Sequence, residues 1–164
     1  MRRRPLLTVG HGARSTDELV AVLRSAAVGR LVDVRRYPGS RRHPQFSRQA
    51  MASDLAARGV SYEWRGEELG GRRKPAEPTR HPEWIDPGFR GFADYADSPA
   101  FRAALQRLLA DAAHDPPLAI MCAETLWWRC HRRLIADAAV AAGSHVVHLL
   151  DPGKTQDHPH SLPM

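Results

Sequence analysis

The chain has little lysine, few cysteines and no long hydrophobic run. Only Lys74 and Lys154 among its 24 basic residues are lysines, and Cys122 and Cys130 are its only cysteines. No apolar stretch approaches the roughly 20 residues that a helix needs to cross a bilayer. The basic first residues lack the apolar core and the cleavage site of a secretory signal. Two thiols with seven residues between them also make no disulfide framework. We therefore expect a cytoplasmic protein with free thiols and no membrane partner.

Apolar runs and helical periodicities alternate along the 164 residues, which is the size of one ordinary domain. Short β-branched or apolar runs predict strands at 6–10, 31–35, 60–64, 118–122 and 146–150, with helices between most of them. Such alternation predicts an α/β fold, a mostly parallel sheet of about five strands with helices on both faces. Residues 6–150 form this single domain, with a long irregular loop at 65–88 that is rich in glycine and proline. Residues 151–164 are predicted to be a flexible C-terminal tail.

The basic residues are unevenly distributed. The formal charge is +6, and the segment from Val34 to Ser53 contains no acidic residue. Guanidinium groups bind phosphate bidentately, so this segment predicts an anionic partner, either a phosphate-bearing small molecule or nucleic acid. The alternative is a basic loop that only faces water. The segment's basic side chains are Arg35, Arg36, Arg41, Arg42, Arg48 and His43.

Polar residues follow three of the predicted strands. Because ligands bind beyond the carboxyl ends of the strands in parallel sheets, these residues should line one edge. They are Gly10 and His11 after the first strand, residues 35–43 after the second and residues 122–131 after the fourth.

Cys122 ends the most apolar run of the chain and precedes a probable helix start that carries arginines. A thiol at that position would have a lowered pKa and act as a nucleophile. Rhodanese-like sulfurtransferases and cysteine phosphatases share this plan, and the strand 31–35 is similar to the aspartate-bearing strand of rhodaneses. Six residues separate Cys122 from Arg129, one more than in the phosphatase signature. The alternative is that Cys122 is a small buried residue that packs at the end of a strand.

Two other side chains have possible chemical roles. Glu124 at an apolar rim would serve as a general acid or base. His11 would donate a hydrogen bond to an anion or carry a proton, or else bond a loop carbonyl. The spacing of Cys122, Cys130 and His131 does not favour zinc, and we predict neither a metal nor another cofactor. Of the adjacent Trp127 and Trp128, at most one faces a ligand while the other packs into the core.

Several ordered motifs resemble a known bacterial family, the domain of unknown function 488. They are Gly10-His11, Val32–Arg35, Arg41–Phe46, Glu68–Gly71, Phe89–Tyr95, Cys122–Glu124 and Arg129–Arg132, and they span about residues 6–150. After Gly10-His11 the family often has a Ser-Asn-Arg-Ser-like run, where this chain has Gly12-Ala13-Arg14-Ser15. The resemblance implies a compact α/β domain with a polar rim and names no substrate.

These patterns lead to three functional hypotheses. The first is an enzyme-like domain, a hydrolase or transferase, that binds a phosphate-bearing ligand and uses Cys122, Glu124 or His11 in catalysis. The second is a non-catalytic module that binds nucleic acid through the basic segment 35–48. The third is sulfur transfer through a persulfide on Cys122. The predicted ligand-binding residues are Arg35, Arg41, Arg42, His43, Arg129, His131 and Arg132.

Overall fold

The strands form one six-stranded sheet. The structure is a computed structural model that describes residues 4–39 and 41–160. The order across the sheet is β3-β2-β4-β1-β5-β6; β1 to β5 are parallel, and β6 runs antiparallel to β5. The strands are β1 (Leu6–Gly10), β2 (Arg30–Asp33), β3 (Ser61–Trp64), β4 (Leu118–Cys122), β5 (Val146–Asp151) and β6 (Lys154–Asp157).

Serine and aspartate caps begin several of the helices. Ser15 makes a capping box with Glu18 at the start of α1, and Ser98 accepts from the Phe101 amide at the start of α5, where Pro99 occupies the first turn. The helices are α1 (Thr16–Ser25), α2 (Arg48–Ala56), α3 (Gly66–Leu69), α4 (Pro87–Ala96), α5 (Pro99–Ala112) and α6 (Arg132–Ala141), and the short 3₁₀ turns are η1 (Pro44–Phe46) and η2 (Trp127–Arg129).

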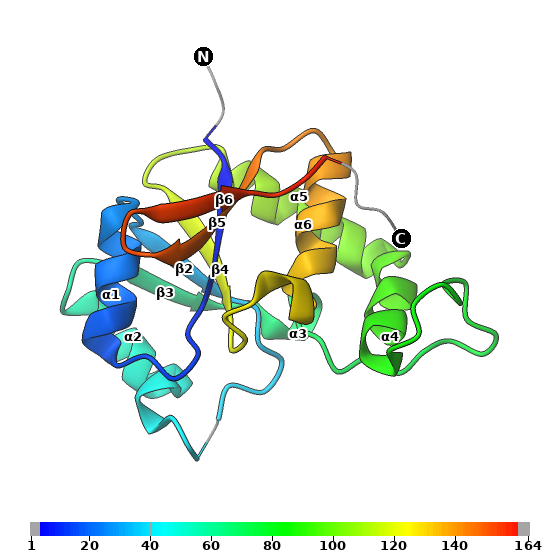
Figure 1. Ribbon diagram of the computed structural model, residues 1–164, viewed down its shortest axis with the longest axis horizontal. Helices are drawn as coiled ribbons and strands as arrows, with labels where there is room; N and C mark the ends of the chain where they lie inside the picture. The colour runs from blue at the N-terminus through cyan, green and yellow to red at the C-terminus, as the bar shows by residue number, and fades with distance from the viewer. Residues whose placement is uncertain (1–3, 40, 161–164) are drawn as a thin grey trace.

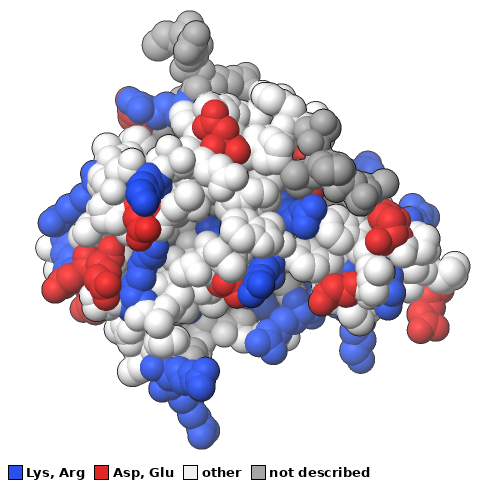
Figure 2. Space-filling view, viewed as in Figure 1, with Lys and Arg blue, Asp and Glu red and all other residues white. Residues whose placement is uncertain are grey.

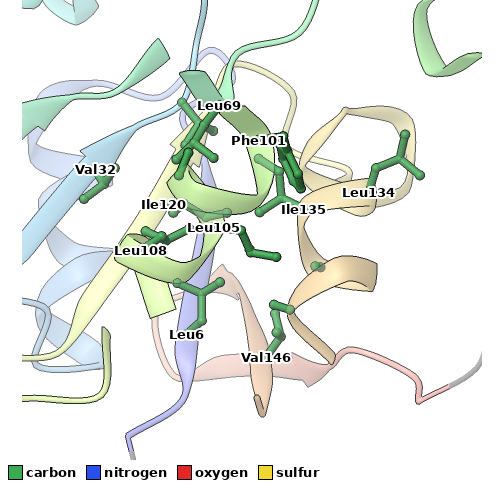
Figure 3. Packing of buried hydrophobic residues seen from close by; sticks show 14 of the residues in the cluster. Leu6, Val32, Leu69, Phe101, Leu105, Leu108, Ile120, Leu134, Ile135 and Val146 are labelled. Carbon is green, nitrogen blue, oxygen red and sulfur yellow. The ribbon is translucent and has the colours of Figure 1, made fainter. Parts of the chain in front are cut away.

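Helices cover both faces of the sheet, as predicted (Figure 1). On one face α1 and α2 bury residues such as Leu19, Leu23 and Leu55. On the other face, Leu105 of α5 and Ile135 of α6 pack against the strands in the same cluster as Leu6 and Ile120 (Figure 3). The central strands β1 and β4 are buried along their whole length, which explains their nearly continuous apolar sequences.

The sheet has six strands where the sequence predicts about five. The additional strand, β6, lies in the predicted flexible tail. Its sequence, Lys-Thr-Gln-Asp, is polar because all four residues are exposed at the sheet edge, so no apolar alternation marks it. A turn at Gly153, with φ of +75°, joins it to β5, and His158 just beyond it is buried. The tail is therefore structured through His158.

The predicted irregular loop 65–88 also contains ordered structure. It includes α3 and the first residues of α4, and Asp94 of α4 fixes its middle part. The Asp94 carboxylate accepts hydrogen bonds from the amides of Ala76 and Arg80 and from the Thr79 hydroxyl, at 2.8–3.0 Å. The loop thus lies at a defined position beside α4. No described helix has the length and apolar character to cross a membrane.

Candidate active site

A pocket of about 400 Å³ opens at the carboxyl ends of β2 and β4. Cys122, the last residue of β4, lines its inner part, although the residue itself is only 1% exposed. The exposed arginines Arg72 and Arg129 are among its lining residues, and Figure 2 shows basic side chains at the lower edge of the molecule, below α2 of Figure 1. The lining residues are Arg35, Arg36, Tyr37, Gly71, Arg72, Asp86, Gly88, Phe89, Cys122, Ala123, Glu124, Arg129, Cys130 and His131.

The two cysteines lie side by side in this pocket as free thiols. Burial alone would raise the pKa of Cys122, but a hydrogen bond with Cys130 and the charge of Arg132 hold the pKa of the Cys122 thiol below its usual range. The same hydrogen bond, together with burial, raises the pKa of Cys130 well above its usual range. Cys122 is therefore the thiol of the pair that ionises first, and Cys130 keeps its proton.

His131 supports Cys130 from the far side. Its Nε2 donates to the Val34 carbonyl oxygen at 3.0 Å, which places the proton on Nε2, and its Nδ1 lies 3.4 Å from the Cys130 sulfur. Burial lowers the pKa of His131 to about 4, so the ring is neutral. His131 thus fixes Cys130 and does not bring a positive charge to the pocket.

Arg35 lies at the pocket but is held in a buried ion pair. Its Nε and Nη2 donate to the two carboxylate oxygens of Asp33 at 2.9 and 2.7 Å, and Nη2 also donates to the Phe46 carbonyl. The Tyr62 hydroxyl donates to the same carboxylate at 2.5 Å. Burial opposes the charge of Arg35, but the hydrogen bond and charge of Asp33 raise its pKa. Asp33 therefore largely balances the positive charge of Arg35, which the sequence predicts to bind a ligand.

His11 lies behind Arg35 and outside the pocket lining. Nδ1 of His11 contacts the Gly12 carbonyl at 2.8 Å, and Nε2 accepts from Nη1 of Arg35 at 3.2 Å. The ring stacks on Phe46, with centroids 4.2 Å apart, and burial lowers its pKa to about 4. This arrangement matches the predicted alternative of a histidine that bonds a loop carbonyl.

Glu124 and Arg129 both face the pocket but differ in their contacts. The Glu124 carboxylate accepts from the Leu126 amide at 3.1 Å, which holds it within its own loop. The Arg129 side chain is exposed and makes no hydrogen bond or ion pair within residues 4–39 and 41–160, although its backbone amide donates to the Leu126 carbonyl. Arg129 is thus available to an anion in the pocket.

Arg132 lies beneath the loop after Cys122 and does not line the pocket. It is 1% exposed, and Nη2 donates to the carbonyls of Glu124 and Thr125 at 3.0 and 3.1 Å. Nη1 donates to the Thr8 hydroxyl at 3.3 Å. Arg132 therefore holds this loop against β1 from inside the protein and, contrary to the prediction, is not placed to contact a ligand in the pocket.

The strand ends meet closely around the Cys122 loop. The amides of His11 and Gly12 donate to the carbonyls of Cys122 and Ala123 at 3.0 and 2.9 Å. A Cβ atom on Gly10 would lie 2.0 Å from the Glu124 carbonyl oxygen, so only glycine permits this approach. The end of β1 thus fixes the position of the Cys122 loop.

The structure brings only part of the predicted site together. Arg35, Cys122, Glu124, Arg129 and His131 line the pocket, whereas Arg41 and Arg42 are exposed on the segment before η1 and His43 is half-buried there.

Sequence reasoning missed several side chains of the pocket. Arg72 comes from the predicted irregular loop, where no periodicity marks it, and Phe89 comes from the start of α4. Cys130 follows η2, which turns it back towards Cys122. Arg36, Tyr37 and Cys130 belong to the segments 35–43 and 122–131 that the strand pattern places at this edge, but they were not named as site residues.

Trp127 is buried at 6% exposure and stacks on His148, while Trp128 is 43% exposed, as expected for adjacent rings that point apart. Within the described part of the chain, no group of three or more histidine, cysteine, aspartate or glutamate side chains is placed to hold a metal ion.

The fold and the pocket define a class: a single α/β domain with a cysteine at the carboxyl end of a central parallel strand. The chain belongs to the family described as "Domain of unknown function DUF488", whose profile matches residues 15–139. The resemblance seen in the sequence motifs is thus confirmed. No curated protein and no solved structure matches the chain.

Proposed function

We propose that the protein is an enzyme that acts on a phosphate-bearing ligand with Cys122 as its nucleophile. One observation carries the proposal: the thiol with the lowered pKa lines a pocket that also bears three arginines, the half-buried Arg36 and the exposed Arg72 and Arg129. A thiolate is the reactive form of cysteine, and guanidinium groups bind phosphate oxygens in a bidentate way. The pocket therefore combines a nucleophile with groups that attract its substrate.

Cys122 suits the nucleophilic role better than Glu124 does. The Glu124 carboxylate is engaged by the Leu126 amide, whereas Cys122 lies at the inner end of the pocket beside a proton-bearing thiol. Glu124 also lines the pocket, within reach of a water molecule there, which suits a general base in a second step.

The reaction has two balanced steps. The Cys122 thiolate attacks phosphorus, a sulfur–phosphorus bond forms, and the bond from phosphorus to the leaving oxygen breaks; that oxygen takes a proton from solvent. Water then attacks the thiophosphoryl group, which releases phosphate and restores the thiolate. Another acceptor in place of water makes the same chemistry a transfer.

Hydrolysis of an aryl phosphate monoester, followed by the absorbance of the released phenolate, tests this proposal. We expect Cys122→Ser to reduce kcat by about a thousandfold or more, since a hydroxyl is a far weaker nucleophile at neutral pH. The matched control is Cys130→Ser, a thiol change in the same pocket that keeps a hydrogen-bond donor and should retain activity within about tenfold. Equal activity in wild type and Cys122→Ser would reject the assignment.

Nucleic acid is a second possible ligand, and the basic side chains outside the pocket favour it. Arg41, Arg42 and Arg48 are exposed on or next to the segment between β2 and α2, beyond the pocket mouth. If they bind a phosphate backbone, the affinity for a labelled oligonucleotide should fall steeply with salt, by about 0.7–0.9 log units per released counterion for each tenfold increase. An affinity that is independent of salt would reject this ligand.

Sulfur transfer is a third candidate, supported by the adjacent thiols. The Cys122 thiolate would take the outer sulfur of thiosulfate, forming a persulfide and releasing sulfite. Mass spectrometry after incubation with thiosulfate should then detect one added sulfur on the peptide with Cys122 and none in Cys122→Ser. An unmodified wild-type peptide would exclude this activity.

A further inference from the structure

A buried chain of hydrogen bonds runs from beneath the Cys122 loop to the surface of α6. Nη1 of Arg132 lies 3.3 Å from the Thr8 hydroxyl, which lies 2.5 Å from Nδ1 of His148. Nε2 of His148 lies 2.8 Å from Nδ1 of His158, and Nε2 of His158 lies 2.6 Å from the Asp137 carboxylate. Four elements or their ends, β1, β5, β6 and α6, thus contribute to one path.

The direction of every donor in this chain follows from its two ends. Arg132 has only donors, and the Asp137 carboxylate accepts, so each proton points from Arg132 towards Asp137. Thr8 accepts from Arg132 and donates to His148; His148 donates from Nε2 to His158; and His158 donates from Nε2 to Asp137. In this arrangement every atom on the path has a hydrogen-bond partner. Burial lowers the pKa of His148 to about 3, consistent with a neutral ring.

Within the described part of the chain, no carboxylate forms an ion pair with the buried guanidinium of Arg132. The oxygens that its guanidinium contacts are neutral: the Thr8 hydroxyl and the carbonyls of Glu124 and Thr125. Its Nε has no hydrogen-bond partner among the described residues. A buried charge without a counterion is costly. A negative charge close to this guanidinium would therefore lower the cost of burying it, and the guanidinium would in turn favour the ionised form of that neighbouring group.

The Cys122 sulfur shares a contact atom with Arg132. The Cys122 thiol donates to the Glu124 carbonyl oxygen at 3.3 Å, and Nη2 of Arg132 donates to the same oxygen at 3.0 Å. The thiol and the guanidinium are therefore neighbours across one oxygen atom. Arg132 reaches the loop from below, so it leaves the pocket side of the sulfur open.

We propose that Arg132 is the positioning residue that keeps Cys122 as a thiolate, and that Thr8, His148, His158 and Asp137 form the chain that holds its guanidinium in place. The inference rests on the proposed role of Cys122 as a nucleophile. In this scheme Arg132 stabilises the Cys122 thiolate, whereas Arg36, Arg72 and Arg129 at the pocket mouth bind the phosphate group of the substrate.

The test measures the ionisation of Cys122 without any substrate. The full-length protein is alkylated with iodoacetamide from pH 5 to pH 10, and mass spectrometry follows the peptide that carries Cys122. We expect Arg132→Met to move the inflection to higher pH and to slow alkylation at pH 7 about tenfold or more, because only the thiolate reacts. Arg132→Lys keeps the charge and should restore part of the rate. Arg102→Gln, which removes an exposed arginine on α5, is the matched control and should leave the profile unchanged.

Thr8→Val provides a second variant that keeps the shape and alters no charge. It breaks the chain at the hydroxyl between Arg132 and His148, so a change in the Cys122 profile reports on the position of the guanidinium. We expect alkylation at pH 7 to slow about two- to fivefold. Thr155→Val, on the exposed strand β6, is the matched control.

Two results would overturn the inference. One is a folded Arg132→Met protein with the wild-type profile of Cys122. The other, decisive if Arg132→Met does not fold, is a Thr8→Val protein that melts at a lower temperature but keeps the wild-type profile, which would make the chain purely structural. Neither depends on turnover: if aryl phosphate is not hydrolysed but the profiles shift as expected, the proposed reaction fails and the role of Arg132 stands.

Discussion

Two buried arginines flank the Cys122 loop, and their surroundings differ in charge. The Arg35 side chain is 8% exposed and pairs with Asp33, which also accepts from Tyr62. Arg132 is 1% exposed, and among the described residues its guanidinium donates to neutral oxygens alone. The sequence places both among the ligand-binding residues, yet the ion pair of Arg35 is nearly neutral as a unit, whereas Arg132 keeps its field. Burial of a guanidinium therefore says little about function until its counterion is known.

Acid should destabilise both regions, and this is the largest effect that we expect. Burial lowers the pKa of His11, beside Arg35, to about 4, and the pKa values of His131 and His148, near Arg132, to about 4 and about 3. These histidines bind protons more readily when unfolded, so the stability they provide is complete above about pH 6.5 and is lost as the pH falls towards 4. Three protons correspond to roughly 4 kcal/mol per pH unit at most.

Urea unfolding at pH 7, 6 and 5.5 measures this dependence. His148→Gln should reduce the slope by about one proton, and His114→Gln, an exposed histidine, should not change it. A free energy of unfolding that stays constant from pH 7 to pH 5.5 would contradict the neutral, buried state of these rings.

Asp33→Asn should remove the difference between the two arginines. Arg35 then becomes a buried cation without a counterion, which costs roughly 3–5 kcal/mol of stability. Chemical denaturation measures the loss, with Asp54→Asn on the exposed side of α2 as the control. If Asp33→Asn is as stable as wild type, the Asp33–Arg35 ion pair contributes little to stability, and Arg35 and Arg132 do not differ in the way proposed here.

Tyr62→Phe is a milder test of the same ion pair. It removes one hydrogen bond to the Asp33 carboxylate and should cost about 2 kcal/mol, the value typical of a hydrogen bond to a charged group. Tyr37→Phe removes a hydroxyl from a ring that is 67% exposed and should change stability by less than about 0.5 kcal/mol. Equal losses in both variants would show that the Tyr62 hydroxyl has no special part in the pair.

The arginines at the pocket mouth should have the smallest effect on folding. Arg72→Gln and Arg129→Gln lie on the surface and should change stability by less than about 0.5 kcal/mol. Their effect should appear in the aryl phosphate assay as a KM that rises several-fold while kcat changes little, because they bind negative charge in the ground state and the transition state alike. A lower kcat with an unchanged KM would instead assign them to the chemical step.

The sequence predicted the sheet and the place of the site because both depend on local patterns. Apolar runs identified β1, β2 and β4, and the rule for parallel strands brought Arg35 and Cys122 to one edge.

Which side chains contact each other in the site depends on tertiary structure, and local sequence patterns do not reveal it. Arg132 and Arg129 are three residues apart, yet one turns under the loop and the other into solvent. Arg72 joins the pocket because Asp94 fixes its loop, and Asp33 satisfies Arg35 through a side chain two residues away on the same strand end. β6 was missed because an exposed polar edge strand has no hydrophobic periodicity.

The position of β1 decides where the chain can be cut. β1 precedes the family match at 15–139, and β5 and β6 follow it, yet β1 lies between β4 and β5 in the sheet. A fragment trimmed to the matched residues would expose the full edge of β4 to solvent and would lose the amides of His11 and Gly12 that anchor the cysteine loop. Truncation at the limits of the family profile would thus remove β1 from the centre of the sheet together with β5 and β6 on the far side of it.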